Sequence, residues 1–210
     1  PAKMSNDKSA ILIAGPTASG KSGLALELAS ACGGYVVNTD SMQVYDVLNV
    51  LTARPEADAL SAVDHFLYGH VHPSQDYSTG RWMTDVTTLL ARPDIQGRTP
   101  VFVGGTGLYF RALTGGISQM PDVPSDIRAK WRQRLGEESP EALHPVLADI
   151  DPEAASRIKP QDGQRIVRAL EIYEASGKPI SHWQGIHSAP LIDTDRADRI
   201  LLLPERALLS

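Results

Sequence analysis

A chain of 210 residues is long enough for one packed α/β domain with a modest appendage, whereas two full domains would be cramped. Hydrophobic residues make up 42% and charged residues 21%, as is typical of a globular protein, and no apolar run approaches the length needed to cross a bilayer. The net charge of −5 argues against a protein that coats long stretches of nucleic acid, but it is compatible with a local basic cleft.

The chain begins with a polar stretch, residues 1–8, that leads directly into an apolar segment. This pattern fits neither a signal peptide nor an amphipathic transit peptide. A single cysteine, Cys32, cannot form an internal disulfide. We therefore expect a cytoplasmic protein, and we expect it to be a monomer.

Residues 10–14 form an apolar run without polar alternation, which predicts a parallel strand buried on both faces. After a glycine-rich turn, good helix formers continue up to Gly33 and Gly34, which are common residues at a helix C-terminus. Residues 35–39 predict a second strand. The first part of the chain is thus a strand, a loop, a helix and a strand.

The same alternation continues further along the chain. Residues 77–91 predict a helix that ends before Pro93, and residues 101–103 predict a third strand that ends at two glycines. From about Pro121 four short helical patterns replace the strand-like runs, and residues 200–203 then predict one more core strand. Strands that alternate with helices imply a parallel sheet with right-handed crossovers.

A phosphate-binding loop is predicted between the first strand and the first helix. The motif G-x-x-x-x-G-K-[ST] is matched in full by Gly15, Pro16, Thr17, Ala18, Ser19, Gly20, Lys21 and Ser22. Glycines let backbone N–H groups approach phosphate oxygens, and the helix N-terminus adds partial positive charge. Lys21 would neutralise the terminal phosphate, and the Ser22 hydroxyl would ligate Mg²⁺. An ordinary glycine-rich turn with a capping serine is the weaker alternative.

The predicted fold is therefore α/β, a P-loop NTPase-like parallel sheet flanked by helices, with a helical insertion domain. We assign residues 1–120 and 198–210 to the core and residues 121–197 to the insertion. The loop itself indicates only that phosphates bind, because kinases, NTPases and other transferases all use it.

Two further segments are predicted at the carboxyl edge of the sheet, where ligands of open α/β folds bind. Asp40 follows the second strand and would face the phosphate site, although alone it would be explained equally by a helix N-cap. VGGTGLY at 103–109 ends the third strand with glycines that allow backbone to approach a ligand, and Thr106 adds a hydroxyl there.

Together these segments resemble the tRNA dimethylallyltransferase family, also called isopentenyl-tRNA transferases. VGGTGLY and QRIVRALE are the specific parts of a resemblance that covers nearly the whole chain. The matching segments are GPTASGKS at 15–22, DSMQVY at 40–45, TARP at 52–55, VGGTGLY at 103–109, MPDVPSDIR at 120–128, DPEAASRIKPQDGQRIVRALEIY at 151–173 and SGKPIS at 176–181.

The resemblance implies transfer of a dimethylallyl group from dimethylallyl diphosphate to N6 of the adenosine adjacent to the anticodon, position 37, of certain tRNAs. It implies that Asp40 is the general base and acts with Lys21 and Thr106, and that Arg206 binds the leaving diphosphate. The implied tRNA contacts are Asp40, Ser41, Met42, Gln43, Thr106, Arg128, Gln164, Arg165, Ile166, Val167 and Arg168.

The helix predicted around residues 164–173 would place Ile166, Leu170 and Tyr173 on a packed face and Gln164 and Arg168 on a face able to meet RNA. An ordinary solvated helix is the alternative. Trp131 and Trp183 are expected to anchor the small helices, although they could stack on bases. The histidines show no metal-ligand spacing, and His65, His70 and His72 are expected in loops.

This sequence departs from the family pattern in two ways. Residues 46–51 do not match it. Family members also continue beyond position 210 with further helices, so we expect the C-terminal part of the core to be missing.

Three rival functions stay open. They are a P-loop small-molecule or nucleotide kinase that uses ATP, a prenyltransferase that acts on free adenine nucleotide, and an RNA-binding P-loop protein without chemistry.

Overall fold

The structure is a computed structural model that describes residues 9–46 and 63–203. It consists of two compact units, one containing residues up to Gly116 together with those from Ala189 onwards, and the other spanning Ile117–Ser188. The second unit is helical, and its boundaries differ from the expected 121–197. Within the described ranges, no helix has the length and apolarity to span a membrane.

The first unit is built on a parallel sheet. In the described part of the chain it has five strands in the order β3-β2-β4-β1-β5, and every pairing is parallel. The strands are β1 (Ala10–Ala14), β2 (Tyr35–Asn38), β3 (His65–Phe66), β4 (Pro100–Gly104) and β5 (Ala197–Leu201). The predicted α/β class with a parallel sheet is confirmed.

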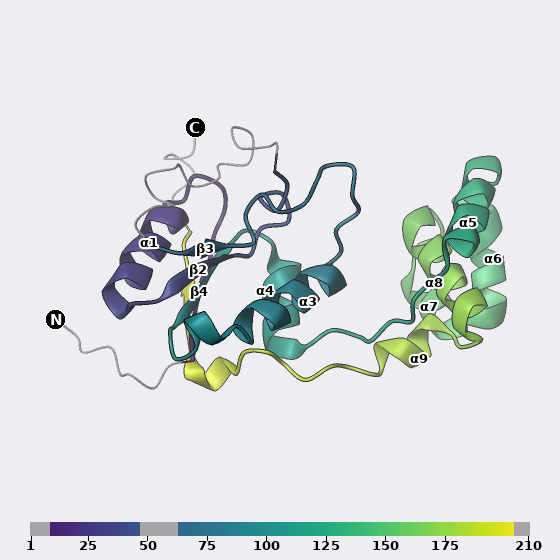
Figure 1. Cartoon of the computed structure of the whole chain (residues 1–210). Helices are drawn as coiled ribbons and strands as arrows, with labels where there is room; N and C mark the ends of the chain where they lie inside the picture. Colours follow the sequence, from purple (N-terminus) through teal and green to yellow (C-terminus); the bar gives the residue numbers. More distant parts are fainter. Residues whose placement is uncertain (1–8, 47–62, 204–210) are drawn as a thin grey trace. The chain divides into compact units, whose positions relative to one another are not determined.

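Helices cover both faces of this sheet (Figure 1). Helix α1 (Lys21–Cys32) packs on the face that carries Ile11, Ile13 and Val101. Helices α3 (Thr79–Leu90) and α4 (Gly107–Gly115) lie on the other face and pack against each other, and the ring of Trp82 stacks on that of Tyr109 at 4.2 Å between centroids. Short 3₁₀ turns lie at Pro93–Ile95 and Thr194–Arg196.

Two details predicted for this sheet are wrong. His65 is not a loop residue but belongs to β3, which pairs with Val36 and Val37 of β2. The last strand joins the sheet as expected, in parallel with β1, but it begins at Ala197 rather than at residue 200. Among the described residues it pairs only with β1 and so lies at the edge of the sheet, and Leu201 is 63% exposed there.

The second unit contains five helices in its described residues, one more than the four predicted patterns. They are α5 (Ser125–Glu137), α6 (Pro140–Ile150), α7 (Pro152–Arg157), α8 (Gly163–Ser176) and α9 (Ile180–Gln184). Their core contains Leu143, Leu147 and the buried face of α8. Trp131 is buried in this core, and its indole N–H donates to Glu174 at 2.7 Å, so the anchoring role expected for it is confirmed.

Candidate active site

Three segments meet at the carboxyl edge of the sheet because β1, β2 and β4 are parallel neighbours. The phosphate loop follows β1, Asp40 follows β2, and Thr106 follows β4. Backbone hydrogen bonds join them: Gly15 N–H donates to the Gly104 carbonyl at 3.3 Å, and Thr106 N–H donates to the Thr39 carbonyl at 3.3 Å. The sheet topology thus brings together three segments that are distant in sequence.

The phosphate loop encloses a cavity of about 330 Å³. The loop turns through left-handed backbone at Ala18 (φ 62°) and Gly20 (φ 81°), and α1 begins at the next residue. The Ser19 hydroxyl oxygen is buried and has no hydrogen-bond partner within the described structure. Gln43, from the segment that follows Asp40, also lines the cavity. A helix N-terminus and an unpaired hydroxyl beside a cavity are suited to phosphate oxygens.

Lys21 is the positively charged residue that lines this cavity, and it is only 5% exposed. Its ammonium group donates to the Pro16 carbonyl at 2.8 Å, which holds it against the loop. Burial lowers the pKa of Lys21, and the negative charge of Asp40 opposes that change. Lys21 and Asp40 are therefore close enough to interact electrostatically.

Hydrogen bonds fix the position of Asp40. One carboxylate oxygen accepts from the Met42 N–H at 2.9 Å, and the Asp40 N–H donates to the Asn38 side-chain carbonyl at 3.0 Å. Asn38 in turn donates from its amide to the carbonyls of Asp40 and Leu67, each at 3.0 Å. These hydrogen bonds thus hold the carboxylate at the end of β2.

Thr106 organises the same loop. Its hydroxyl oxygen accepts from the Ser41 N–H at 2.9 Å and donates to the Ser41 hydroxyl at 3.2 Å. Beside it, a Cβ added to Gly105 would lie 3.3 Å from the Asp40 carboxylate. Thr106 therefore stabilises the backbone next to Asp40.

Several residues around Asp40 were not found from the sequence. Tyr109 is buried, and its hydroxyl has no hydrogen-bond partner among the described residues. Burial, and then the charges of Tyr45 and Asp40, raise the pKa of Tyr109 to about 12. Tyr68 is also affected, because burial and then Asp40 raise its pKa. Tyr109 ends the VGGTGLY motif, so the sequence carried a signal for it, whereas nothing in the sequence indicated Tyr68.

Few side chains around the cavity could bind Mg²⁺ directly. No group of three or more His, Cys, Asp or Glu side chains able to hold a metal is present in the ranges that the structure describes. Ser22 is exposed at the start of α1, beside the cavity. A Mg²⁺ ion held by one hydroxyl, phosphate oxygens and water fits this arrangement, because Mg²⁺ is commonly bound with substrate phosphates and few protein ligands.

The other predicted nucleic-acid contacts lie in the helical unit. Arg128 is exposed on α5, and Gln164 and Arg165 are exposed on α8. Arg168 is partly exposed and lies 3.4 Å from the carboxylate of the buried Glu171. Ile166 and Val167 belong instead to the core of the unit, so their side chains do not reach its surface.

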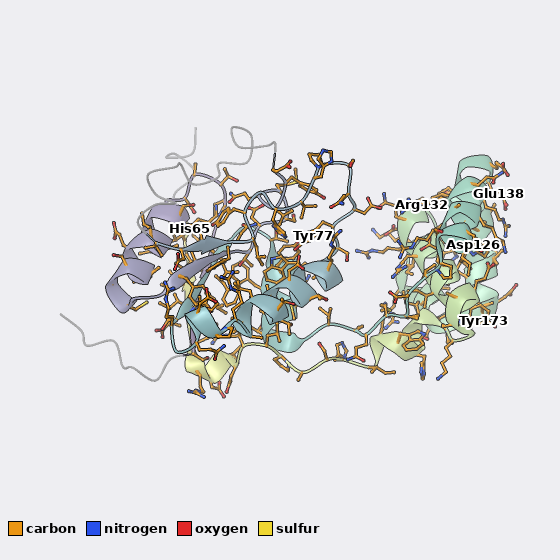
Figure 2. The ribbon with its side chains drawn as sticks, in the orientation of Figure 1. His65, Tyr77, Asp126, Arg132, Glu138 and Tyr173 are labelled. Atoms are coloured by element: carbon orange, nitrogen blue, oxygen red, sulfur yellow. The ribbon has the colours of Figure 1, made fainter. Side chains whose placement is uncertain are left out.

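Tyr173 of α8 does not lie on the packed face of the helix, where it was expected. Tyr173 is 37% exposed and points away from the core, as Figure 2 shows, since it lies in the last turn of the helix.

Three predicted segments lie outside the described residues. They are the expected diphosphate ligand Arg206, the TARP segment at 52–55 and residues 47–51, where the family pattern is not matched.

We expect the Gly104→Ala variant to be destabilised. A Cβ at this position would lie 2.1 Å from the Thr39 carbonyl oxygen, so backbone must shift where the three segments meet. Overpacking of this kind costs about 1–3 kcal/mol or more. Gly107→Ala is the matched control, because its Cβ would meet nothing within 4 Å. Chemical denaturation of both variants checks this, and equal stabilities would contradict the close approach at Gly104.

The chain matches two family models. One, described as IPP transferase, covers residues 43–210, and the other, described as isopentenyl transferase, covers residues 8–68. Among curated proteins, the tRNA dimethylallyltransferase of Chelativorans sp. is 58% identical over 97% of this chain and 70% of its own length. The protein of the same name from Sinorhizobium medicae is 56% identical over 98% of this chain and 68% of its own.

Solved structures of tRNA-modifying transferases also resemble this chain. A eukaryotic dimethylallyltransferase acting on tRNA has a TM-score of 0.77 and 29% identity, over 94% of this chain and 49% of that one. The tRNA isopentenylpyrophosphate transferase of Bacillus halodurans has a TM-score of 0.51 and 35% identity, over 82% of this chain and 57% of that one. This chain thus spans about half the length of these two solved proteins.

The parallel sheet and the loop define a P-loop NTPase-like protein with a carboxylate beside its phosphate cavity. Within that class, the chain belongs to the IPP transferase family, and the curated relatives compared above are named tRNA dimethylallyltransferase.

Proposed function

We propose that this chain transfers a dimethylallyl group from dimethylallyl diphosphate to N6 of adenosine 37 in tRNA and releases diphosphate. The observation that carries the proposal is the placement of Asp40 beside the phosphate loop at one edge of the sheet: a Cβ added to Gly105 would lie 3.3 Å from the Asp40 carboxylate and 3.5 Å from the Gly15 carbonyl oxygen. Membership of a family whose relatives are named for transfer to tRNA supports it. A cytoplasmic location and a monomeric state stay predictions.

The phosphate loop would serve as a clamp for the leaving group. Cleavage of the allylic C–O bond leaves its electron pair on the diphosphate, and fixed donors stabilise that charge best where they need no rearrangement. The backbone N–H groups of the loop, the Ser19 hydroxyl and the Lys21 ammonium would supply these donors, since Ser19 and Lys21 line the cavity. Ser22 would hold Mg²⁺, which supplies further positive charge to the diphosphate.

Asp40 would act on the other reactant. The exocyclic amine of adenine is a weak nucleophile because its lone pair is delocalised into the ring, so a base must accept its proton as the new C–N bond forms. One carboxylate oxygen of Asp40 is fixed by the Met42 N–H, and the other would accept that proton. The adenine must leave its stack to reach this carboxylate, as base-modifying enzymes require.

Ser41, Met42 and Gln43 would contact the target nucleotide beside Asp40. Met42 is 54% exposed and is therefore free to meet a base, whereas Gln43 lines the phosphate cavity. Thr106 would keep this segment in place through its two hydrogen bonds to Ser41. Arg206 stays a predicted ligand of the leaving diphosphate.

The decisive experiment offers unmodified tRNA together with either labelled dimethylallyl diphosphate or labelled ATP. Label that moves from dimethylallyl diphosphate to the tRNA supports the proposal. Consumption of ATP alone would favour a kinase, and transfer of the prenyl group only to free adenine nucleotide would favour the prenyltransferase that needs no RNA.

The exposed side of α8 is proposed to bind tRNA. We expect Arg165→Ala to weaken tRNA affinity and to reduce the salt slope of binding by about one, as for the loss of one phosphate contact. Binding of dimethylallyl diphosphate should not change. Arg132→Ala on α5 is the control, because Arg132 is also exposed in the helical unit (Figure 2). Titrations of tRNA at several salt concentrations measure this, and identical slopes for the two variants would identify α8 as a solvated surface.

A further inference from the structure

A second cavity, of about 280 Å³, lies in the helical unit and is lined by three guanidinium groups. Its lining includes Arg157 of α7, Arg165 and Arg168 of α8, and Gln184 of α9, together with the apolar side chains of Ile158 and Ile180. Neither Arg157 nor Gln184 was among the residues predicted to contact RNA. The cavity therefore combines a cationic rim with an apolar wall.

Ion pairs and one hydrogen bond hold the arginines around this cavity, and among the described residues they leave several N–H donors unused. Arg157 donates to the Gln184 side-chain carbonyl at 2.9 Å and lies 3.2 Å from Glu153. Arg165 and Arg168 lie 3.4 Å from Asp162 and Glu171 respectively. Such contacts use one or two of the five N–H donors of each guanidinium. The three acidic partners do not line the cavity, so its rim offers donors to an anion.

The walls of the cavity are fixed by a buried carboxylate. Asp151 is 3% exposed, and its two oxygens accept from the Ala154 N–H of α7 and the Ser181 N–H of α9, each at 3.0 Å. The starts of these two helices are thereby tied to each other. Arg157 and Gln184 consequently face the arginines of α8 without a loop that must reorder on binding.

We infer that this cavity binds one unpaired nucleotide of an RNA, with its phosphate on the arginines and its base against the apolar wall. Guanidinium groups match phosphate oxygens with paired hydrogen bonds, and their flat faces stack on unstacked bases. A volume close to the lower end for small-ligand sites suits one nucleotide better than a longer stretch of RNA. The inference rests on the proposed function in that the RNA would be the tRNA substrate.

The sharpest test is Gln184→Glu. The new carboxylate keeps the size of Gln184 and still accepts from Arg157, so a purely structural role predicts unchanged or higher stability. In a nucleotide site it places a negative charge beside the phosphate. We expect the affinity of the full chain for an RNA hairpin with an unpaired loop to fall roughly tenfold, the loss of about one charge-assisted contact.

Arg157→Lys tests the same cavity from the other side, since it keeps the charge but loses the paired donors. We expect weaker hairpin binding than for Lys159→Ala, which removes an exposed charge two residues away that does not line the cavity. Thermal unfolding of each variant shows whether a loss of RNA affinity is caused by a loss of stability. A fully paired RNA duplex is the second probe, and its affinity should change less than that of the hairpin.

The inference is overturned if Gln184→Glu and Arg157→Lys, both folded, bind the hairpin like Lys159→Ala, or if they weaken hairpin and duplex equally. Failure of the proposed function looks different. In that case the unchanged chain does not transfer a prenyl group to tRNA, whatever the variants do in the hairpin titration.

Discussion

Replacement of Asp40 by asparagine is expected to lower the rate of prenyl transfer by a factor on the order of 10²–10⁴, the usual contribution of a general base. Asparagine keeps the size of the side chain and the oxygen that accepts from the Met42 N–H, so the local loop should persist. What it removes is the acceptor for the amine proton. The affinity for dimethylallyl diphosphate should change little, because the proposed binding site of that donor is the phosphate loop.

Single-turnover kinetics with saturating tRNA measure this effect apart from substrate binding. Asp46→Asn serves as a control, since it neutralises an exposed carboxylate on the same segment. A rate within about threefold of the unchanged chain, far less than the loss of a general base, would show that another group accepts the proton.

Lys21→Met is expected to slow prenyl transfer by roughly 10²–10³, as for the removal of one fixed donor from a developing anion. Methionine has a similar length and is apolar, so it tolerates the burial that Lys21 undergoes. Because the ammonium would touch the diphosphate before and during bond cleavage, donor affinity should also fall. This distinguishes Lys21 from Asp40, whose loss should affect the rate alone.

The measurement is donor binding by calorimetry together with the transfer rate under the same conditions. Lys178→Met is the control, because Lys178 is an exposed lysine of the helical unit. Unchanged donor affinity and rate in Lys21→Met would mean that the loop does not hold the diphosphate.

Much of the fold around the loop was predictable because local signals agree there. The apolar run at Ala10–Ala14 forms β1, and the helix that follows ends at Gly33, whose φ of 63° explains the choice of glycine. The short strand β3 was missed because His65 and Phe66 are only partly buried and form no apolar run. The start of β5 was missed for a related reason, since Asp198 and Arg199 break the apolar pattern of an edge strand.

The residues of the site, too, could be predicted only where a local sequence motif marks them. Lys21, Asp40 and Thr106 each stand in a motif, so their positions could be predicted, and the parallel sheet brings their segments to one edge. By contrast, the contact of Asn38 with Leu67 and that of Arg157 with Gln184 join residues 29 and 27 positions apart. Such contacts depend on how elements pack and leave no local pattern in the sequence.

Nucleoside analysis of the tRNA product tests most directly whether this chain alkylates adenosine 37 of tRNA, as we propose. Unmodified tRNA is incubated with the chain, dimethylallyl diphosphate and Mg²⁺, then digested to nucleosides and analysed by mass spectrometry. We predict an adenosine that has gained one dimethylallyl group, that maps to the position next to the anticodon and that is absent with Asp40→Asn over the same time. Transfer to another position, equal transfer by Asp40→Asn, or consumption of the donor without modified nucleoside would contradict the account.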